Sequence, residues 1–252
     1  MKAYDYLVRC PSFPLIKRKF QDFVEFSKSV EVIPWKEEFA VADRNPEAVD
    51  HLAFLEMLFE MKAITKEEFE RETAKLPAYA SRTGGVAFIE EGVVSFRDEN
   101  PAEHIIIHEV GHCYFREPDQ IWNASYGGGE ALFWLIIRND LPLNELAIFQ
   151  YHSWLRKVLQ GQVEEVAEEI VRKLSKLNLP VSPHIYAYQL YAGTIGMGAE
   201  IPGELFIDLE NERWREVKVS KAGLLSFLAN LMVGAGLGDS IYLAYLQAIF
   251  NL

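Results

Sequence analysis

Apolar side chains recur every three or four residues along most of the chain, which is the spacing of one face of an α-helix. Segments with this spacing cover residues 14–27, a stretch that begins near Pro46, 143–160, 162–178, 184–198 and two apolar stretches near the C-terminus. Thr65 and Glu68 have the spacing of a capping box and predict the start of a further helix. The pattern therefore predicts a chain that is mainly helical.

Two pairs of short apolar segments interrupt the helical pattern and predict β-hairpins. VAFIE and VVSFR, joined by Glu91-Gly92, predict a hairpin over residues 86–97, and a second pair predicts one over 205–219. We therefore expect an α+β fold with a small antiparallel sheet before the central helix and a helical C-terminal half. The expected regions are a mostly helical N-terminal part at 1–80, a central core at 81–140 and a helical part at 141–252, which together are expected to form one compact unit.

The central helix has the clearest start signal in the sequence. Asn100 is expected as its N-cap, Pro101 at its first helical position and Glu103 as the partner that completes a capping box. The helix should run to about Arg116, because Pro118 prevents much further extension.

This helix contains the motif H-E-x-x-H, at His108-Glu109-Val110-Gly111-His112. Residues four apart lie on one face of a helix, with Cα atoms about 6 Å apart. Two imidazole nitrogens at that spacing can bind one Zn²⁺ at about 2.0–2.1 Å. Glu109 follows the first ligand, so it flanks the metal and can accept a proton from metal-bound water, whose pKa zinc lowers to about 7. The motif predicts one zinc ion per chain, with Glu109 as the general base.

A catalytic zinc site takes three protein ligands and one open position, so a third ligand is needed. Glu130 is our candidate, 18 residues after His112 at the start of the next strongly apolar helix. The three glycines before it allow close approach of the backbone. The apolar residues after it predict that this helix belongs to the core and that Glu130 points inward.

Other ligand schemes stay open beside Glu130. Asp119 and His152 are weaker alternatives for the third position. His104 lies eight residues from His112, about 12 Å along the helix axis, which is too far for one tetrahedral ion. Cys10 would reach the metal only as a thiolate that holds the enzyme latent.

The pair of histidines followed by a helical glutamate resembles the gluzincin branch of the zincin metallopeptidases. The resemblance implies that His108, His112 and Glu130 are zinc ligands and that Glu109 is the general base. It also implies a zincin-like fold for the core at 81–140, in which the hairpin at 86–97 supplies an edge strand that pairs with the substrate backbone.

The chain departs from that family at two points. The family often has an acidic residue four positions after the ligand glutamate, to orient a histidine, and this chain has Trp134 there. The residue that stabilises the oxyanion is also unassigned, with His184, Tyr186, Tyr188 and Tyr191 as candidates. The sequence therefore predicts a zinc metallopeptidase, with a catalytically inactive or latent zincin-like protein that binds peptides or proteins as the alternative.

Charge and composition limit the classes of partner that we expect for this chain. The chain has 25 Lys+Arg against 37 Asp+Glu, a formal net charge of −12, which argues against nucleic acids and anionic membranes as partners. Two cysteines in 252 residues fit a reducing compartment. We identify no signal peptide and read the apolar stretch 222–238 as a buried helix, too short to span a bilayer. A cytoplasmic location and a peptide or protein substrate are expected.

Overall fold

A computed structural model describes residues 1–39, 55, 65–74, 84–122, 128–174 and 221–250. The chain forms two compact units, residues 1–124 (unit 1) and 125–252 (unit 2), and the predicted core region at 81–140 extends across their boundary. The expected helices near Pro46 and at 184–198 and the expected hairpin at 205–219 lie outside the described residues.

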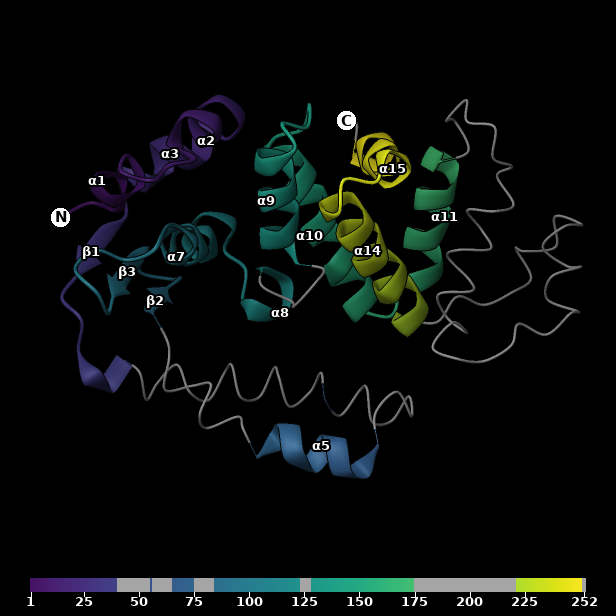
Figure 1. The fold of residues 1–252 in the computed structure, drawn as a ribbon, viewed down its shortest axis with the longest axis horizontal. Helices are drawn as coiled ribbons and strands as arrows, with labels where there is room; N and C mark the ends of the chain where they lie inside the picture. Colours follow the sequence, from purple (N-terminus) through teal and green to yellow (C-terminus); the bar gives the residue numbers. More distant parts are fainter. Residues whose placement is uncertain (40–54, 56–64, 75–83, 123–127, 175–220, 251–252) are drawn as a thin grey trace, which may run out of the picture. The chain divides into compact units, whose positions relative to one another are not determined.

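Unit 1 is built around one buried helix. Its described elements are α1 (Ala3–Leu7), α2 (Phe13–Lys19), α3 (Gln21–Ser27), β1 (Glu31–Ile33), α5 (Lys66–Thr73), β2 (Gly85–Phe88), β3 (Val93–Phe96), α7 (Glu103–Phe115) and α8 (Asp119–Trp122). Helix α7 packs against β2 and β3 on one side and against α1 and α3 on the other (Figure 1). Ile107 and Val110 of α7 are fully buried between these layers. This helix carries the H-E-x-x-H motif, so the motif lies in the core of unit 1.

The sheet of unit 1 has three described strands in the order β1-β3-β2. The hairpin prediction is confirmed, because β2 pairs with β3 in antiparallel register, with Ala87 opposite Val94. Gly92 completes the turn with φ 64°, a conformation that glycine adopts without strain. The sequence pattern did not predict β1, which pairs with β3 in parallel. Three residues are too few to show an alternation of apolar and polar positions.

The predicted start of α7 is wrong by two residues. Its N-cap is Ala102, so Asn100 and Pro101 precede the helix. The Glu103 carboxylate does not close a capping box, because its Oε1 accepts a hydrogen bond from the backbone N–H of Ser12 at 2.8 Å. A hydrogen bond to a residue 91 positions earlier in the sequence therefore replaces the expected capping box. The predicted end is confirmed, with Arg116 as the C-cap.

Two other predictions about helix ends have different outcomes. The helix expected over 14–27 is divided into α2 and α3 by Phe20, which has non-helical backbone angles of φ −129° and ψ 62°. The capping box at Thr65 is confirmed. The Thr65 Oγ1 accepts from the Glu68 N–H at 3.2 Å, and the Glu68 carboxylate accepts from the Thr65 N–H at 2.8 Å.

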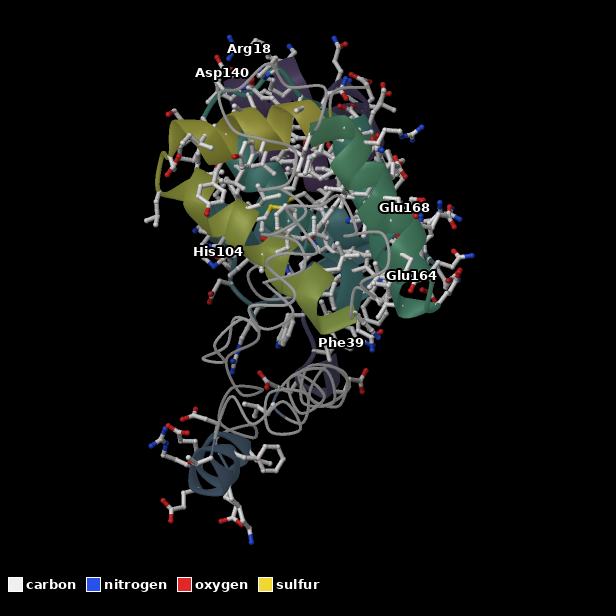
Figure 2. All side chains as sticks on the ribbon, turned by 90° about the vertical axis from the view of Figure 1, so that its right-hand side faces the viewer. Arg18, Phe39, His104, Asp140, Glu164 and Glu168 are labelled. Carbon is white, nitrogen blue, oxygen red and sulfur yellow. The ribbon has the colours of Figure 1, made fainter. Side chains whose placement is uncertain are left out.

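Unit 2 consists of helices packed on one another. They are α9 (Gly129–Arg138), α10 (Glu145–Leu159), α11 (Val163–Leu174), α14 (Lys221–Gly236) and α15 (Ser240–Phe250). The apolar stretch at 222–238 forms most of α14, which buries Leu224, Leu228 and Leu231 as expected for a core helix. Among the described residues, no helix combines the length and hydropathy needed to cross a bilayer. Glu164 and Glu168 lie on the outward, exposed face of α11 (Figure 2).

Replacing Glu103 tests the contact that sets the start of α7. Glu103→Ala should lower the free energy of unfolding by about 1–2 kcal/mol, because it removes a charge-assisted hydrogen bond to the Ser12 N–H. Urea denaturation of the full chain measures the change. Glu99→Ala, at an exposed position just before the helix, is the matched control and should have almost no effect. Equal effects of the two substitutions would show that the contact with Ser12 contributes nothing.

Candidate metal centre

The two histidines of the motif lie together on one face of α7. Their Nε2 atoms are 3.2 Å apart, and their ring planes are nearly perpendicular, at 88°, with centroids 4.6 Å apart. His112 is buried at 6% exposure, and His108 is partly buried. The predicted pairing of these side chains is present in the structure.

The separation of the two nitrogens fits a shared zinc ion. Two ligands at about 2.0–2.1 Å from a tetrahedral ion lie about 3.3–3.4 Å apart. The observed 3.2 Å between the Nε2 atoms is close to that value. Two neutral imidazole nitrogens at this distance either share one proton or share one metal ion. His108 and His112 therefore need little rearrangement to bind zinc.

The other ring nitrogen of His112 is held by the main chain. His112 Nδ1 lies 2.6 Å from the carbonyl oxygen of Glu117. A carbonyl only accepts hydrogen bonds, so Nδ1 must carry the proton and donate it. In the neutral ring Nε2 then has the lone pair, which is the form that binds a metal through Nε2. Arg116 is in the left-handed conformation (φ 54°, ψ 43°) and turns the chain at the end of α7. After this turn, the carbonyl of the next residue, Glu117, lies at His112.

The Glu109 side chain points toward the start of β2. It is 5% exposed, and a Cβ atom built on Gly85 would lie 2.8 Å from both Cγ and Oε1 of Glu109. A side chain at position 85 would therefore displace the carboxylate. The candidate base thus lies against the backbone of a strand that is at one edge of the sheet as described.

Glu130 is the second residue of α9 and therefore belongs to unit 2. Its Oε1 accepts a hydrogen bond of 3.3 Å from the indole N–H of Trp134, one turn later, and the Arg138 guanidinium lies 5.5 Å from the centroid of that indole. The residue that departs from the family pattern is thus a partner of the candidate ligand. Within the described residues, no three His, Cys, Asp or Glu side chains form a group that could hold a metal. The assignment of Glu130 as third ligand stays a prediction.

The alternative ligands are placed as follows. His104 is exposed (Figure 2), as expected for a residue that does not share the ion. His152, in α10 of unit 2, is fully buried against Gly129, where any β-carbon would collide with its ring. Cys10 is buried and its thiol donates to the Tyr6 carbonyl at 3.7 Å. Burial, with a smaller effect of Glu103, raises the pKa of the Cys10 thiol to about 12, so it is not a thiolate at neutral pH.

Some candidates lie beyond the described parts of the chain. Asp119 begins α8, but its side chain is not among those described. The proposed oxyanion donors also lie outside the described residues: His184, Tyr186, Tyr188 and Tyr191.

The sequence analysis missed three groups that contact the candidate site residues. They are the Glu117 carbonyl at His112, the Trp122 indole at the His108 carbonyl and the Trp134 indole at Glu130. A main-chain carbonyl leaves no signal in a sequence. The spacing of Trp134 from Glu130, one helical turn, was a signal that could have found that contact.

Comparison with known proteins adds no relative: no family model, no curated protein and no solved structure matches this chain.

The buried His152 predicts a pH dependence of stability. Burial, with a smaller contribution from Arg156, lowers the pKa of His152 from 6.5 to about 3. Between these two values the unfolded chain binds a proton that the folded chain does not. Stability should therefore be highest above pH 6.5 and fall as the pH drops toward 3, by at most about 1.4 kcal/mol per pH unit from this group.

The variant His152→Leu isolates this effect. The slope of its unfolding free energy against pH, measured by urea denaturation between pH 7 and 4.5, should be shallower than that of the wild type. Gln160→Leu, at an exposed and non-titrating position at the end of the same helix, is the control and should retain the wild-type slope. A slope in His152→Leu equal to that of the wild type would contradict the prediction.

Proposed function

We propose that this chain is a zinc-dependent hydrolase that cleaves peptide bonds, with His108, His112 and Glu130 as zinc ligands and Glu109 as general base. The observation that carries the proposal is the His108–His112 pair. Its Nε2 atoms are separated by 3.2 Å, and the Glu117 carbonyl selects the metal-binding tautomer of His112. A histidine that ligates a metal through one ring nitrogen almost always donates its other ring N–H to a carbonyl or carboxylate, and His112 has such a partner in the Glu117 carbonyl.

The position of Glu109 supports hydrolysis over metal storage alone. Bound zinc would supply a Lewis acid that polarises a substrate carbonyl and lowers the pKa of water to about 7. Glu109 follows His108 directly in the sequence, and its Oε1 lies beside Gly85 of β2. In the proposed reaction this carboxylate takes the proton from the attacking water and later delivers it to the leaving amine.

Strand β2 supports a peptide as substrate. It pairs with β3 on one side and forms an edge of the sheet as described. An edge strand offers backbone N–H and C=O groups to an extended peptide, which would add to the sheet as another strand. Because Gly85 of β2 lies against Glu109, a peptide bound along this edge would pass close to the candidate base.

Metal content is the first test. Protein purified without chelators and without a His-tag column should contain about one zinc per chain by elemental mass spectrometry. His108→Ala and His112→Ala should lose the zinc, because each removes a ligand. Absence of zinc in the wild type, even after zinc is added at neutral pH, would overturn the proposal.

Glu109→Gln separates catalysis from binding. The variant should retain the zinc content of the wild type and lose at least about 100-fold in the rate of hydrolysis of a peptide library, because the amide cannot accept the proton. The wild type provides the reference rate. A wild type that binds zinc and cleaves no peptide in the library would point to the non-catalytic peptide-binding alternative, and full activity in Glu109→Gln would exclude Glu109 as the base.

Glu130→Gln tests the third ligand. We expect its zinc dissociation constant, measured by competition with a chromogenic chelator, to rise by more than the roughly 10–100-fold typical of outer hydrogen-bond partners. Glu164→Gln, on the exposed face of α11, is the control and should bind zinc like the wild type. If the two variants bind zinc equally tightly, Glu130 is not a ligand.

A further inference from the structure

Trp122 is fully buried at the end of the short helix α8, and it contacts the motif at three points. Its indole N–H donates a 3.0 Å hydrogen bond to the carbonyl oxygen of His108. Its ring lies against the Cα of Gly111, and its centroid lies 6.5 Å from that of His112 at an interplanar angle of 65°. A single side chain thus contacts both candidate ligands and the residue between them.

The hydrogen bond from Trp122 is made to the turn of α7 that links the two histidines. In an α-helix the carbonyl of one residue pairs with the N–H four positions later, so the His108 carbonyl belongs to the turn that joins His108 to His112. A carbonyl oxygen has two lone pairs and can accept a second donor. The Trp122 indole is that second donor, and it fixes the turn that sets the spacing between the two imidazoles.

The same indole explains the glycine inside the motif. A β-carbon at position 111 would collide with three atoms of the Trp122 ring. A glycine at position 111 is therefore required for the tryptophan to pack against the helix here. The ring also stacks on Phe115 of the same helix, with centroids 4.9 Å apart and planes inclined by 24°.

The connection between α7 and α8 brings Trp122 to this position. The chain reverses at Arg116, presents the Glu117 carbonyl to His112 and continues through Pro118 into α8. The backbone N–H of Trp122 donates to the Pro118 carbonyl at 2.9 Å, which ties the end of α8 to its start. Residues 116–122 therefore act on the histidine pair from two sides, through a carbonyl at His112 and an indole at His108.

We infer that Trp122 is a positioning residue for the zinc site, an inference that rests on the proposed function of His108 and His112. It acts through the helix backbone and through packing, and it touches neither substrate nor metal. By holding the turn between the ligands and packing beside His112, it keeps the two Nε2 atoms at a separation that one zinc ion can bridge. Loss of the indole should therefore raise the zinc dissociation constant, in addition to the loss of stability expected from replacing any buried tryptophan.

Trp122→Phe tests this inference, because it retains an aromatic ring and removes the indole N–H. We expect its zinc dissociation constant, measured on the full chain by chelator competition at neutral pH, to rise by about 10-fold, the lower end of the range for groups that orient metal ligands. Replacement of zinc by Co²⁺ gives a second readout. The visible absorption of the bound Co²⁺ reports ligand geometry and should change in the variant.

Trp154→Phe is the matched control. Trp154 is also a buried tryptophan, and its indole also donates a 3.0 Å hydrogen bond, to Glu169 within unit 2. The control should lower the Tm as Trp122→Phe does, while its zinc dissociation constant and Co²⁺ spectrum remain those of the wild type. If Trp122→Phe does not fold, Trp122→Met provides the same comparison, because methionine fills irregular core space and carries no hydrogen-bond donor.

The outcomes separate this inference from the proposed function. Zinc binding that requires both histidines and weakens in Trp122→Phe but not in Trp154→Phe supports the inference. Zinc binding that requires both histidines and is unchanged in Trp122→Phe overturns the inference alone, and equal weakening in both tryptophan variants also overturns it, because the effect is then general loss of packing. A wild type that binds no zinc overturns the inference and the proposed function together.

Discussion

The structure of unit 1 depends on the cost of burying polar side chains in a helix that is otherwise apolar. An unsatisfied buried hydrogen-bonding group costs roughly 1–3 kcal/mol, and α7 places Glu109 and His112 at 5% and 6% exposure among isoleucine and valine side chains. For His112 the surroundings meet this cost locally. The chain turns at Arg116 to present a carbonyl to His112, and Gly85 leaves room for the Glu109 carboxylate. Both features lie outside the helix, one in the hairpin before it and one in the turn after it.

Groups without net charge make the described contacts to the candidate ligands. A main-chain carbonyl orients His112, an indole N–H binds the carbonyl of His108, and another indole N–H binds Glu130. Such partners fix the direction of the groups that they bind. In the proposed site, Glu109 and Glu130 would then supply the negative charge that faces the metal.

Local sequence patterns predicted much of the secondary structure of unit 1. They did not predict the features that depend on contacts between residues far apart in the sequence. The hairpin and the body of α7 were predictable, because alternation, a glycine turn and helical spacing are all local signals. The first residue of α7 was not, because Glu103 bonds to Ser12, 91 residues earlier. The histidine pair was predictable from a spacing of four residues, whereas Trp122 reaches the His108 carbonyl from 14 residues further along the chain. The role of Glu130 was inferred from its place at the start of an apolar helix and from resemblance to a family, and its contact with Trp134 gives it a local partner without testing that role.

The left-handed conformation of Arg116 has a consequence for how this protein tolerates mutation. The partner of His112 Nδ1 is a main-chain carbonyl, so no side-chain replacement can delete it. What replacement can change is the direction of the chain, and that is set at an exposed residue whose φ is 54°. Glycine and asparagine adopt this conformation readily and β-branched residues do not. Position 116 should therefore accept few residue types although its side chain is exposed. A substitution at this surface position would change the direction of the chain and so move the carbonyl that orients His112.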